Sequence, residues 1–400
     1  MRTKQKVRFL IIALLIFIMV SSYITTTVIA KKYMEVSAEK AEGAAVLDAT
    51  TATTSYASGM VVIEAESGRI LYQKNCNERL AMASTTKIMT ALLALESGLD
   101  LDEEFTVDER SVGIEGTSLY LRKGEKKTLK ELLYGLMLPS GNDSAVAIAC
   151  RVSGGEEEFV KLMNQKASEL GLKNTSFANA HGLDSEGHYT SAYDLAMITA
   201  EAMKNPTFCE IVKTKNVTVS GNEEVSGKAL KNKNKLLWSM EGCDGVKTGF
   251  TDNAKRCFVC SAKRDGMRLI CVVLNCGPMF EEAERLLNMG FDNFKKYTLL
   301  SSYQPNETVP VKDGVSETVK TLTRRHFSIP LTVEERSNVE YEVDLPKEIQ
   351  APVEKEQELG EVKVKLGDKV LFTEKIYAME EVESTRFFDK VEQITDYWNI

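Results

Sequence analysis

Residues 81–98 read AMASTTKIMTALLALESG, an apolar run whose front edge carries Ser84 and Lys87. From residue 84 to residue 97 nearly every face is apolar, which predicts a helix buried inside a larger domain. Gly98 is a typical helix stop. Residues three apart share one face of a helix, so we expect the side chains of Ser84 and Lys87 to lie together.

The pairing of Ser84 with Lys87 suits nucleophilic catalysis. A serine hydroxyl is a weak nucleophile until a neighbouring base takes its proton. A lysine can be that base when burial lowers its pKa, because desolvation disfavours the ammonium form. The first helical turn also presents backbone N–H groups to a developing oxyanion. Alone the pattern is weak evidence, since Ser37 and Lys40 repeat it in a polar segment.

A second motif lies in the segment LMLPSGNDSAVA, residues 136–147. Ser140, Gly141 and Asn142 fall between two predicted helices, where a turn can aim a hydroxyl and an amide into a cleft. The alternative is that these residues only cap the next helix. Taken alone, capping is the better interpretation.

A third motif lies in DGVKTGFTDNA, residues 244–254. Lys247, Thr248 and Gly249 come just before a predicted strand hairpin. At a strand edge they would offer an ammonium, a hydroxyl and an unobstructed backbone to a substrate carboxylate. By itself, Lys-Thr-Gly is more often a simple turn.

Strand-like segments flank a helical region between residues 45 and 300. Residues 59–73 predict a hairpin that turns at Ser67–Gly68, and residues 257–276 predict another that turns at 264–266. Four segments between or after them have helical periodicity: residues 128–138, 143–154, 156–172 and 280–297. This order predicts an α/β sheet domain with a helical insertion.

The remaining C-terminal sequence alternates between apolar and polar residues. Residues 306–380 predict a small β sandwich, in which Val339, Tyr341, Val343 and Leu345 share the buried face. Residues 384–400 predict an amphipathic helix. Its polar face is more acidic than is usual for membrane-surface helices, so docking on the protein and membrane contact are equally favoured.

The N-terminal 30 residues resemble an export signal. Arg2, Lys4, Lys6 and Arg8 precede the apolar run 9–20, and Ala30 ends a weakly polar stretch. The pattern predicts a signal peptide or an N-terminal membrane anchor, with cleavage slightly favoured. Residues 31–44 would form a tether, and the rest of the chain would lie outside the cytoplasm.

The net charge and the cysteines narrow the kinds of partner and metal site that the protein could have. The net charge of −8 argues against a nucleic-acid partner. The chain has eight cysteines, and Cys257 and Cys260 form a C-x-x-C on a predicted strand, where they would face opposite sides. No second such pair exists, so we expect no metal. Disulfide pairing stays open.

The three motifs in this order resemble those of the serine D-alanyl-D-alanine carboxypeptidases, the low-molecular-mass penicillin-binding proteins. Residues 67–96 resemble that family's nucleophile region, residues 174–198 its Asn-Gly-Leu…His-Tyr-Thr segment, and residues 306–380 its β domain. The resemblance implies a catalytic domain at 45–300, an antiparallel sheet with helices on both faces. It also assigns the site residues. The implied catalytic residues are Ser84, Lys87 and Ser140, and the implied substrate-binding residues are Asn142, Lys247, Thr248, Gly249 and Phe250.

The resemblance implies removal of the terminal D-alanine from peptidoglycan stem peptides that end in D-Ala-D-Ala, through a serine acyl-enzyme. β-Lactams would be inhibitors, and no cofactor is expected. The enzyme would act at the outer face of the cytoplasmic membrane or in the cell wall, held by its N-terminus, its C-terminal helix or both. One departure from the family pattern is Lys255–Arg256, where the family has a small pair.

Two alternatives stay open. A class A β-lactamase needs an additional Glu in a Glu-x-x-Leu-Asn segment between the second and third motifs. This chain has such a segment only at Glu284–Asn288, after Lys247, within a predicted amphipathic helix. A catalytically inert cell-wall scaffold of the same fold is the other alternative, although no motif residue is lost.

Overall fold

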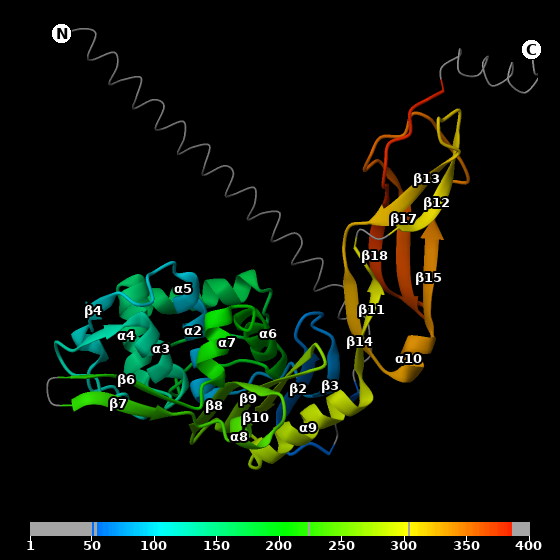
Figure 1. Ribbon diagram of the computed structural model, residues 1–400. Coiled ribbons are helices and arrows are strands. Elements are labelled where there is room, and N and C mark those ends of the chain that lie inside the picture. Colours follow the sequence, from blue (N-terminus) through cyan, green and yellow to red (C-terminus); the bar gives the residue numbers. More distant parts are fainter. Residues whose placement is uncertain (1–49, 52–53, 223–224, 303–304, 386–400) are drawn as a thin grey trace, which may run out of the picture.

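The computed structural model describes residues 50–51, 54–222, 225–302 and 305–385. They form a body of sheet and helices, followed by a smaller body of strands at one end (Figure 1). The predicted leader and tether, residues 1–44, lie outside the described residues, as does nearly all of the predicted helix at 384–400. Among the described residues, no helix is both long and apolar enough to cross a membrane.

A six-stranded sheet forms the centre of the larger body, in the order β1-β3-β2-β10-β9-β8. Neighbouring strands are antiparallel, except that the short β1 pairs in parallel with β3. The strands are β1 (Thr50–Thr51), β3 (Ile70–Lys74), β2 (Gly59–Glu64), β10 (Met267–Leu274), β9 (Lys255–Arg264) and β8 (Cys243–Thr251). Both predicted hairpins, β2–β3 and β9–β10, are present.

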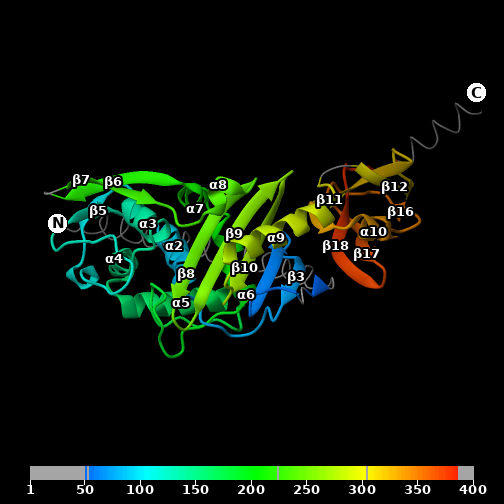
Figure 2. The ribbon, with the colours of Figure 1, turned by 90° about the horizontal axis from the view of Figure 1, so that it is seen from below.

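Helices cover both faces of this sheet (Figure 2). One face packs against a helical group with a large apolar core: α2 (Lys87–Glu96), α3 (Leu129–Met137), α4 (Asn142–Ser153), α5 (Glu156–Glu169), α6 (Ala192–Ala202) and α7 (Pro206–Lys213). The other face packs against α8 (Leu236–Ser239) and α9 (Met279–Asn293). This is the predicted mixed α/β fold, with the helical insertion placed between β3 and β8.

Local sequence signals explain where several of these helices begin and end. Thr128 and Glu131 form a capping box at the start of α3. Asn205 caps α7 and Pro206 is its first residue, a position that needs no backbone N–H. At the end of α4, Gly154 takes the left-handed conformation that stops a helix. These signals set the ends of three helices in the group that packs against the sheet.

Two small hairpins and a 3₁₀ turn lie beside the helical group. The hairpins are β4 (Glu104–Thr106) with β5 (Lys126–Thr128), and β6 (Asn216–Asn222) with β7 (Val225–Lys231); the turn is η2 (Glu109–Ser111). In Figure 1 the β6–β7 hairpin runs below α3 and α4, away from the strand body. The sequence analysis predicted no strands at these positions.

The smaller body joins two sheets through an apolar core. A two-stranded sheet pairs β11 (Lys295–Leu300) with β14 (Phe327–Leu331), and a six-stranded sheet has the order β15-β17-β18-β13-β12-β16. Leu299, Ile329, Val362 and Val364 are among the residues of the shared core. The remaining elements are β12 (Pro305–Lys312), β13 (Thr318–Thr323), α10 (Val333–Ser337), β15 (Val339–Asp344), β16 (Ile349–Gln350), β17 (Glu358–Leu366) and β18 (Lys369–Ala378).

Two local predictions were wrong. The helix expected to continue through residue 297 ends at Asn293, because Lys295 to Leu300 pair with β14 as a strand. The face expected to be buried on β15 is largely exposed, with Tyr341 at 45% and Val343 at 40%. The reason is that β15 is an edge strand of its sheet, so little packs over its outer part.

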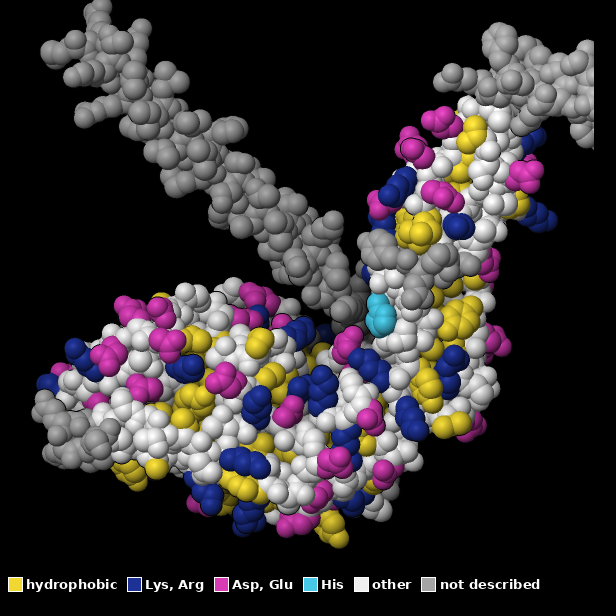
Figure 3. Space-filling model, in the orientation of Figure 1, with side chains coloured by type: hydrophobic (Ala, Val, Ile, Leu, Met, Phe, Trp, Pro, Cys, Tyr) yellow, Lys and Arg dark blue, Asp and Glu magenta, His cyan; other side chains and the backbone are white. Residues whose placement is uncertain are grey.

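A buried arginine connects the two bodies. Arg69, in the β2–β3 turn, is 1% exposed and donates hydrogen bonds to the Pro330 carbonyl and to Glu335. Its guanidinium also stacks on the Phe294 ring. Lys296 and Glu66 form a more exposed pair at the same junction. Elsewhere on this side of the molecule, acidic and basic side chains are interspersed (Figure 3).

Candidate functional site

Ser84 and Lys87 meet at the front of the predicted helix. Ser84 lies in a 3₁₀ turn, η1 (Ala83–Thr86), and the α-helix proper begins at Lys87. The Lys87 amine donates to Ser84 Oγ at 2.9 Å. The turn is tight because the hydroxyls of Thr85 and Thr86 bond back to the carbonyls of Met82 and Ala83. A 3₁₀ first turn is common at helix N-termini.

The Lys87 amine is buried and is held by three oxygens from separate segments. Besides Ser84 Oγ, it donates to Asn142 Oδ1 at 2.7 Å and to the His181 carbonyl at 2.5 Å. Lys87 itself is 0% exposed. This arrangement leaves the amine a single orientation, pointing at the serine hydroxyl.

The surroundings lower the pKa of Lys87 well below its ordinary value. Burial is the largest cause, and the positive charges of Lys247 and Lys233 add to it, while Asp143 opposes the shift. A buried amine near other cations loses its proton readily, since the charged form is poorly solvated. The lysine is therefore suited to accept a proton rather than to form an ion pair.

Ser140 and Asn142 lie at the turn into α4, where Asn142 contacts the Lys87 amine. Ser140 is 4% exposed and has a left-handed backbone, with φ at +78°. Its hydroxyl has no hydrogen-bond partner among the described residues. Asn142 also donates its side-chain amide to the Glu115 carbonyl at 2.6 Å and its backbone N–H to Thr117 at 2.7 Å. The structure thus brings the second motif to the first.

The third motif lies on β8, with Lys247 buried at 1% exposure and Thr248 at 9%. Burial, with help from the charge of Lys233, lowers the pKa of Lys247 to about 7. The Lys247 amine donates to the Thr248 carbonyl at 2.9 Å. Phe250, two residues after Thr248 on the same strand, is 61% exposed.

Gly249 brings β8 against the serine turn. A Cβ atom at Gly249 would lie 3.1 Å from the Ser84 nitrogen and 3.1 Å from the Met82 carbonyl. Such contacts are tighter than nine in ten real Cβ contacts, so glycine at this position allows the approach without displacing the serine turn. The backbone of β8 and the N–H of Ser84 consequently face one another across a narrow gap.

A turn at residues 179–184 completes this side of the site. Asn179 shapes it by accepting the Gly182 N–H at 2.7 Å and donating to the Leu183 carbonyl at 2.9 Å. Gly182 has φ at +92°, and a Cβ there would lie 2.0 Å from the Ala83 carbonyl. Asp184 accepts from the Thr251 hydroxyl at 2.9 Å, which ties the turn to the end of β8.

Neither histidine of this segment is placed as a base for Ser84. His188 accepts the Ala178 N–H through Nδ1 and contacts the Thr86 hydroxyl through Nε2 at 2.8 Å. His181 contacts Glu156 and supplies its backbone carbonyl to Lys87. Burial lowers the pKa of both imidazoles to about 4, so both are neutral near pH 7.

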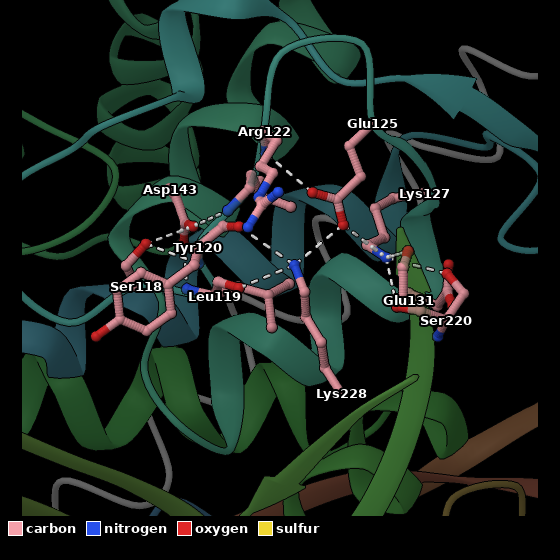
Figure 4. Close-up of polar contacts among 12 residues, drawn as sticks. Ser118, Leu119, Tyr120, Arg122, Glu125, Lys127, Glu131, Asp143, Ser220 and Lys228 are labelled. Carbon is pink, nitrogen blue, oxygen red and sulfur yellow. Dashed lines mark hydrogen bonds and ion pairs between the residues drawn. The ribbon is translucent and has the colours of Figure 1, made fainter. Parts of the chain in front are cut away.

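Buried charges hold the loop at residues 118–122 (Figure 4), which directly follows the Glu115 and Thr117 carbonyls that accept hydrogen bonds from Asn142. Asp143, 0% exposed, accepts the N–H groups of Leu119 and Leu121 and the Ser118 hydroxyl. From β7, Lys228 donates to the carbonyls of Leu119 and Tyr120. Asp143 therefore holds the N–H groups of this short loop, while Lys228 holds its carbonyls.

Lys228, which holds this loop, also belongs to a larger network of buried charges. Lys228 and Lys127 both contact Glu125 at 3.0 Å. Lys127 also donates to the Ser220 carbonyl at 2.6 Å, and Glu131 accepts the Ser220 N–H at 2.6 Å. The network joins β5, α3 and the β6–β7 hairpin into one support for the loop (Figure 4).

The motifs alone did not reveal several supporting residues. The exposed Lys233 lies with its amine 3.4 Å from the Thr117 hydroxyl, and its charge lowers the pKa of both Lys87 and Lys247. Asp143 and Gly182 shape the surroundings of the amine. The run KNKNK at 231–235 and the Gly in AHGLD were the signals available. Among the described residues, no group of three metal-ligating side chains is assembled.

Comparison with known proteins agrees with this fold. A family model described as D-alanyl-D-alanine carboxypeptidase matches residues 46–277, and one described as the C-terminal domain of penicillin-binding protein 5 matches residues 294–384. The chain belongs to the D-alanyl-D-alanine carboxypeptidase family. It is a serine-type carboxypeptidase, a hydrolase of the penicillin-binding protein class.

Individual relatives extend the match over most of the chain. D-alanyl-D-alanine carboxypeptidase DacF of Bacillus subtilis is 38% identical, covering 86% of this chain and 90% of the relative. DacA of Escherichia coli is 31% identical over 84% of this chain and 86% of its own length. Penicillin-binding protein 5 of Haemophilus influenzae has a TM-score of 0.69 and 31% identity, covering 82% of this chain and 98% of that one.

Glu284, the acid of the Glu-x-x-Leu-Asn segment, is far from this site in the fold. It lies on α9, which packs on the opposite face of the sheet from α2. The structure therefore gives no support to the class A β-lactamase alternative, because that residue has the whole sheet between it and Ser84.

Proposed function

We propose that this enzyme removes the terminal D-alanine of peptidoglycan stem peptides through an acyl-enzyme on Ser84, with Lys87 as the base. The observation that carries the proposal is the 2.9 Å contact between the buried Lys87 amine and Ser84 Oγ. In the first step, the hydroxyl proton passes to Lys87 Nζ as Ser84 Oγ attacks the carbonyl of the penultimate residue. The peptide bond breaks and D-alanine leaves; water then hydrolyses the ester.

Ser140 is the proposed proton relay to the leaving amine. Its hydroxyl is buried two residues before Asn142 and has no hydrogen-bond partner among the described residues, so it is free to pass a proton. Asn142 is proposed to orient both Lys87 and the substrate amide. Its Oδ1 has a second lone pair beyond the one that Lys87 uses, and that lone pair can accept a substrate N–H.

The β8 residues are proposed to bind the substrate. Lys247, as the ammonium, and Thr248 would hold the terminal carboxylate, while Gly249 leaves room for the substrate backbone. The N–H groups of Ser84 and Phe250 would form the oxyanion hole, which is supported by the close approach of Gly249 to the Ser84 nitrogen. β-Lactams would enter as substrate mimics and acylate Ser84.

The place of action is also part of the proposal. The basic and apolar N-terminal residues 1–30 favour export, either by a cleaved signal or by an anchor. Peptidoglycan stem peptides lie outside the cytoplasm, so an exported enzyme meets its substrate at the outer membrane face or in the wall. Contact of the C-terminal segment 384–400 with a membrane remains a second part of this proposal.

Intact mass over time with excess benzylpenicillin tests the mechanism, in parallel with D-alanine release from a D-Ala-D-Ala peptide. We expect a long-lived adduct and D-alanine release, both lost in Ser84→Ala. Ser97→Ala, at the other end of α2, is the matched control and should keep both. Penicillin consumed with only a fleeting adduct would indicate a β-lactamase. Neither adduct nor peptide cleavage would indicate an inert scaffold.

A further inference from the structure

Two thiols outside the proposed mechanism are in contact across neighbouring strands. Cys243 Sγ, at the start of β8, lies 3.8 Å from Cys260 Sγ in the middle of β9. All eight cysteines of the chain are free thiols in this structure. We propose that Cys243 and Cys260 are an oxidisable dithiol, which closes into a disulfide that links β8 to β9.

The strand geometry favours this pair over the other thiols nearby. Cys243 and Cys260 share the sheet face that packs against α9, whereas Cys257 faces the helical group, as its spacing predicted. The β8–β9 ladder is irregular between Cys243 and Gly245, so the Cys243 backbone is not confined by a regular register. Cys271, opposite Cys260 on β10, is the natural competitor.

Exposure and hydrogen bonding give the two thiols different roles. Cys243 is half-buried, and its pKa is lowered, chiefly by the hydrogen bond from Cys260 and also by contacts at Gly245 and Asn234. Cys260 is wholly buried, and burial raises its pKa well above the ordinary value. Cys243 is thus the thiol that reagents reach and the better thiolate, while Cys260 can react only with what Cys243 presents to it.

The oxidant is a low-molecular-mass disulfide, RSSR. The Cys243 thiolate attacks one sulfur, forming a Cys243–SR mixed disulfide and releasing RS⁻. Cys260 then gives up its proton and attacks Cys243 Sγ, which forms the Cys243–Cys260 bond and expels the second RS⁻. Two electrons and two protons pass from the protein thiols to RSSR, which becomes two RSH. An exported protein would meet such oxidising conditions.

The link would stabilise the strand that carries Lys247 and Thr248. Cys243 and Cys260 are 17 residues apart, so the disulfide closes a short loop of the unfolded chain. A loop of that size predicts a rise in Tm on the order of 5 °C for a body of this size, after some native strain. Because neither thiol touches Ser84 or Lys87 in the described contacts, acylation by benzylpenicillin should change less than about twofold.

Oxidised glutathione, followed by alkylation and intact mass of the full chain, tests the proposal. We expect a loss of about 2 Da, two fewer alkylated thiols and a Cys243–Cys260 peptide in a digest. Cys243→Ala should abolish the bond, and Cys260→Ala should leave a stable glutathione adduct on Cys243. Cys271→Ala, a buried neighbour, is the matched control and should still form the bond.

Several results would overturn the proposal. One is full alkylation of both thiols after oxidation of the folded protein. Another is a bond that persists in Cys243→Ala, which would identify Cys260 with Cys271 as the pair. A third is a Cys260→Ala protein that is folded by circular dichroism but takes up no glutathione.

Discussion

The Lys87 amine lies 2.7 Å from Oδ1 of Asn142, so the first residue of α4 positions the first residue of α2. The amide oxygen accepts a hydrogen bond from the amine without adding a negative charge beside it. A carboxylate in that place would raise the pKa of the lysine, because an opposite charge favours the ammonium form. The neutral partner thus orients the amine without adding a charge that would oppose the lowering of its pKa by burial and by Lys247 and Lys233.

Removal of the amine should abolish acylation. We expect Lys87→Ala to lower the rate of Ser84 acylation by benzylpenicillin about a thousandfold or more, since general-base catalysis contributes factors of that order. Ser140→Ala should slow acylation by a smaller factor, about tenfold to a hundredfold. Stopped-flow or mass measurements give both rates. Normal acylation of Lys87→Ala would remove the lysine from the mechanism.

The two buried lysines predict a bell-shaped pH profile for peptide cleavage. Lys87 acts as the neutral amine, so kcat/KM should rise with pH as it loses its proton. Lys247 acts as the ammonium, and its pKa of about 7 predicts that carboxylate binding weakens as the pH rises through that value. A peptide with an amidated C-terminus is the control and should lose the descending limb. The same descending limb with both peptides would contradict the role of Lys247.

A methyl group at residue 182 should disrupt the serine turn. In Gly182→Ala the new Cβ would lie 2.0 Å from the Ala83 carbonyl, so the turn at 179–184 or the 3₁₀ turn has to move. We expect acylation to fall by at least a hundredfold, because small displacements of catalytic groups are costly. Gly187→Ala is the matched control. Its backbone is also left-handed, but nothing lies within 4 Å, so it should lose only about 1 kcal/mol of stability.

Neutralising Asp143 should loosen the loop at residues 118–122. Asp143→Asn keeps the shape but replaces one acceptor oxygen with a donor that faces backbone N–H groups. We expect a loss of about 1–3 kcal/mol in the free energy of unfolding. We also expect a higher KM for the peptide, since the loop supports Asn142. Asp265→Asn, in the exposed β9–β10 turn, should change neither quantity. An unchanged KM in Asp143→Asn would show that the contacts between Asp143 and the loop do not affect substrate binding.

The junction between the two bodies should depend on Arg69. Removing one partner of a buried ion pair costs about 3–5 kcal/mol, so Arg69→Ala should lower the free energy of unfolding by about that amount. Glu66→Gln, which breaks the exposed pair with Lys296, should cost less than about 1 kcal/mol. Urea unfolding measures both values. A small effect of Arg69→Ala would show that packing alone holds the junction.

The same junction predicts an acid-sensitive contribution to stability. Burial, the largest single cause, pushes the pKa of Glu335 up, but the hydrogen bonds from Arg69 and Thr332 and the charge of Arg69 together outweigh it, and the net pKa is lowered. A carboxyl group whose pKa is lower in the folded protein than in the unfolded chain stabilises the fold. The contribution is complete at pH values above the pKa that the group has in the unfolded chain. That contribution disappears as the pH falls through the folded value. In Glu335→Gln this part of the acid dependence should be absent.

Local patterns were enough to predict the main elements and the contact between Ser84 and Lys87. The helices at α3, α4 and α5 follow from apolar periodicity, and the serine and lysine meet because three-residue spacing is fixed by helical geometry. The alternation of side chains along a strand also predicted that Cys257 and Cys260 face opposite sides of the sheet. The roles assigned to the motif residues stay predictions until the experiments above are done.

Other features depend on partners that are distant in the sequence. Lys233 affects Lys87 only because the chain after β7 passes the loop at Thr117, and the lysine-rich run around it does not indicate which distant residues it approaches. The exposure of Tyr341 depends on which strand ends the sheet, whereas alternation only indicates that a face exists. The end of α9 was mispredicted because pairing with β14 outweighs the helical pattern.

The acceptors around the Lys87 amine come from segments that are far apart along the chain, at residues 84, 142 and 181, with Lys247 farther still. No early folding unit contains the whole set, because α2, α4, the 179–184 turn and the edge strand β8 must all dock first. Labelling by penicillin would therefore count only molecules that have finished folding. A newly made chain would not react with the drug until these segments had docked, so the antibiotic would report the time that the enzyme takes to mature.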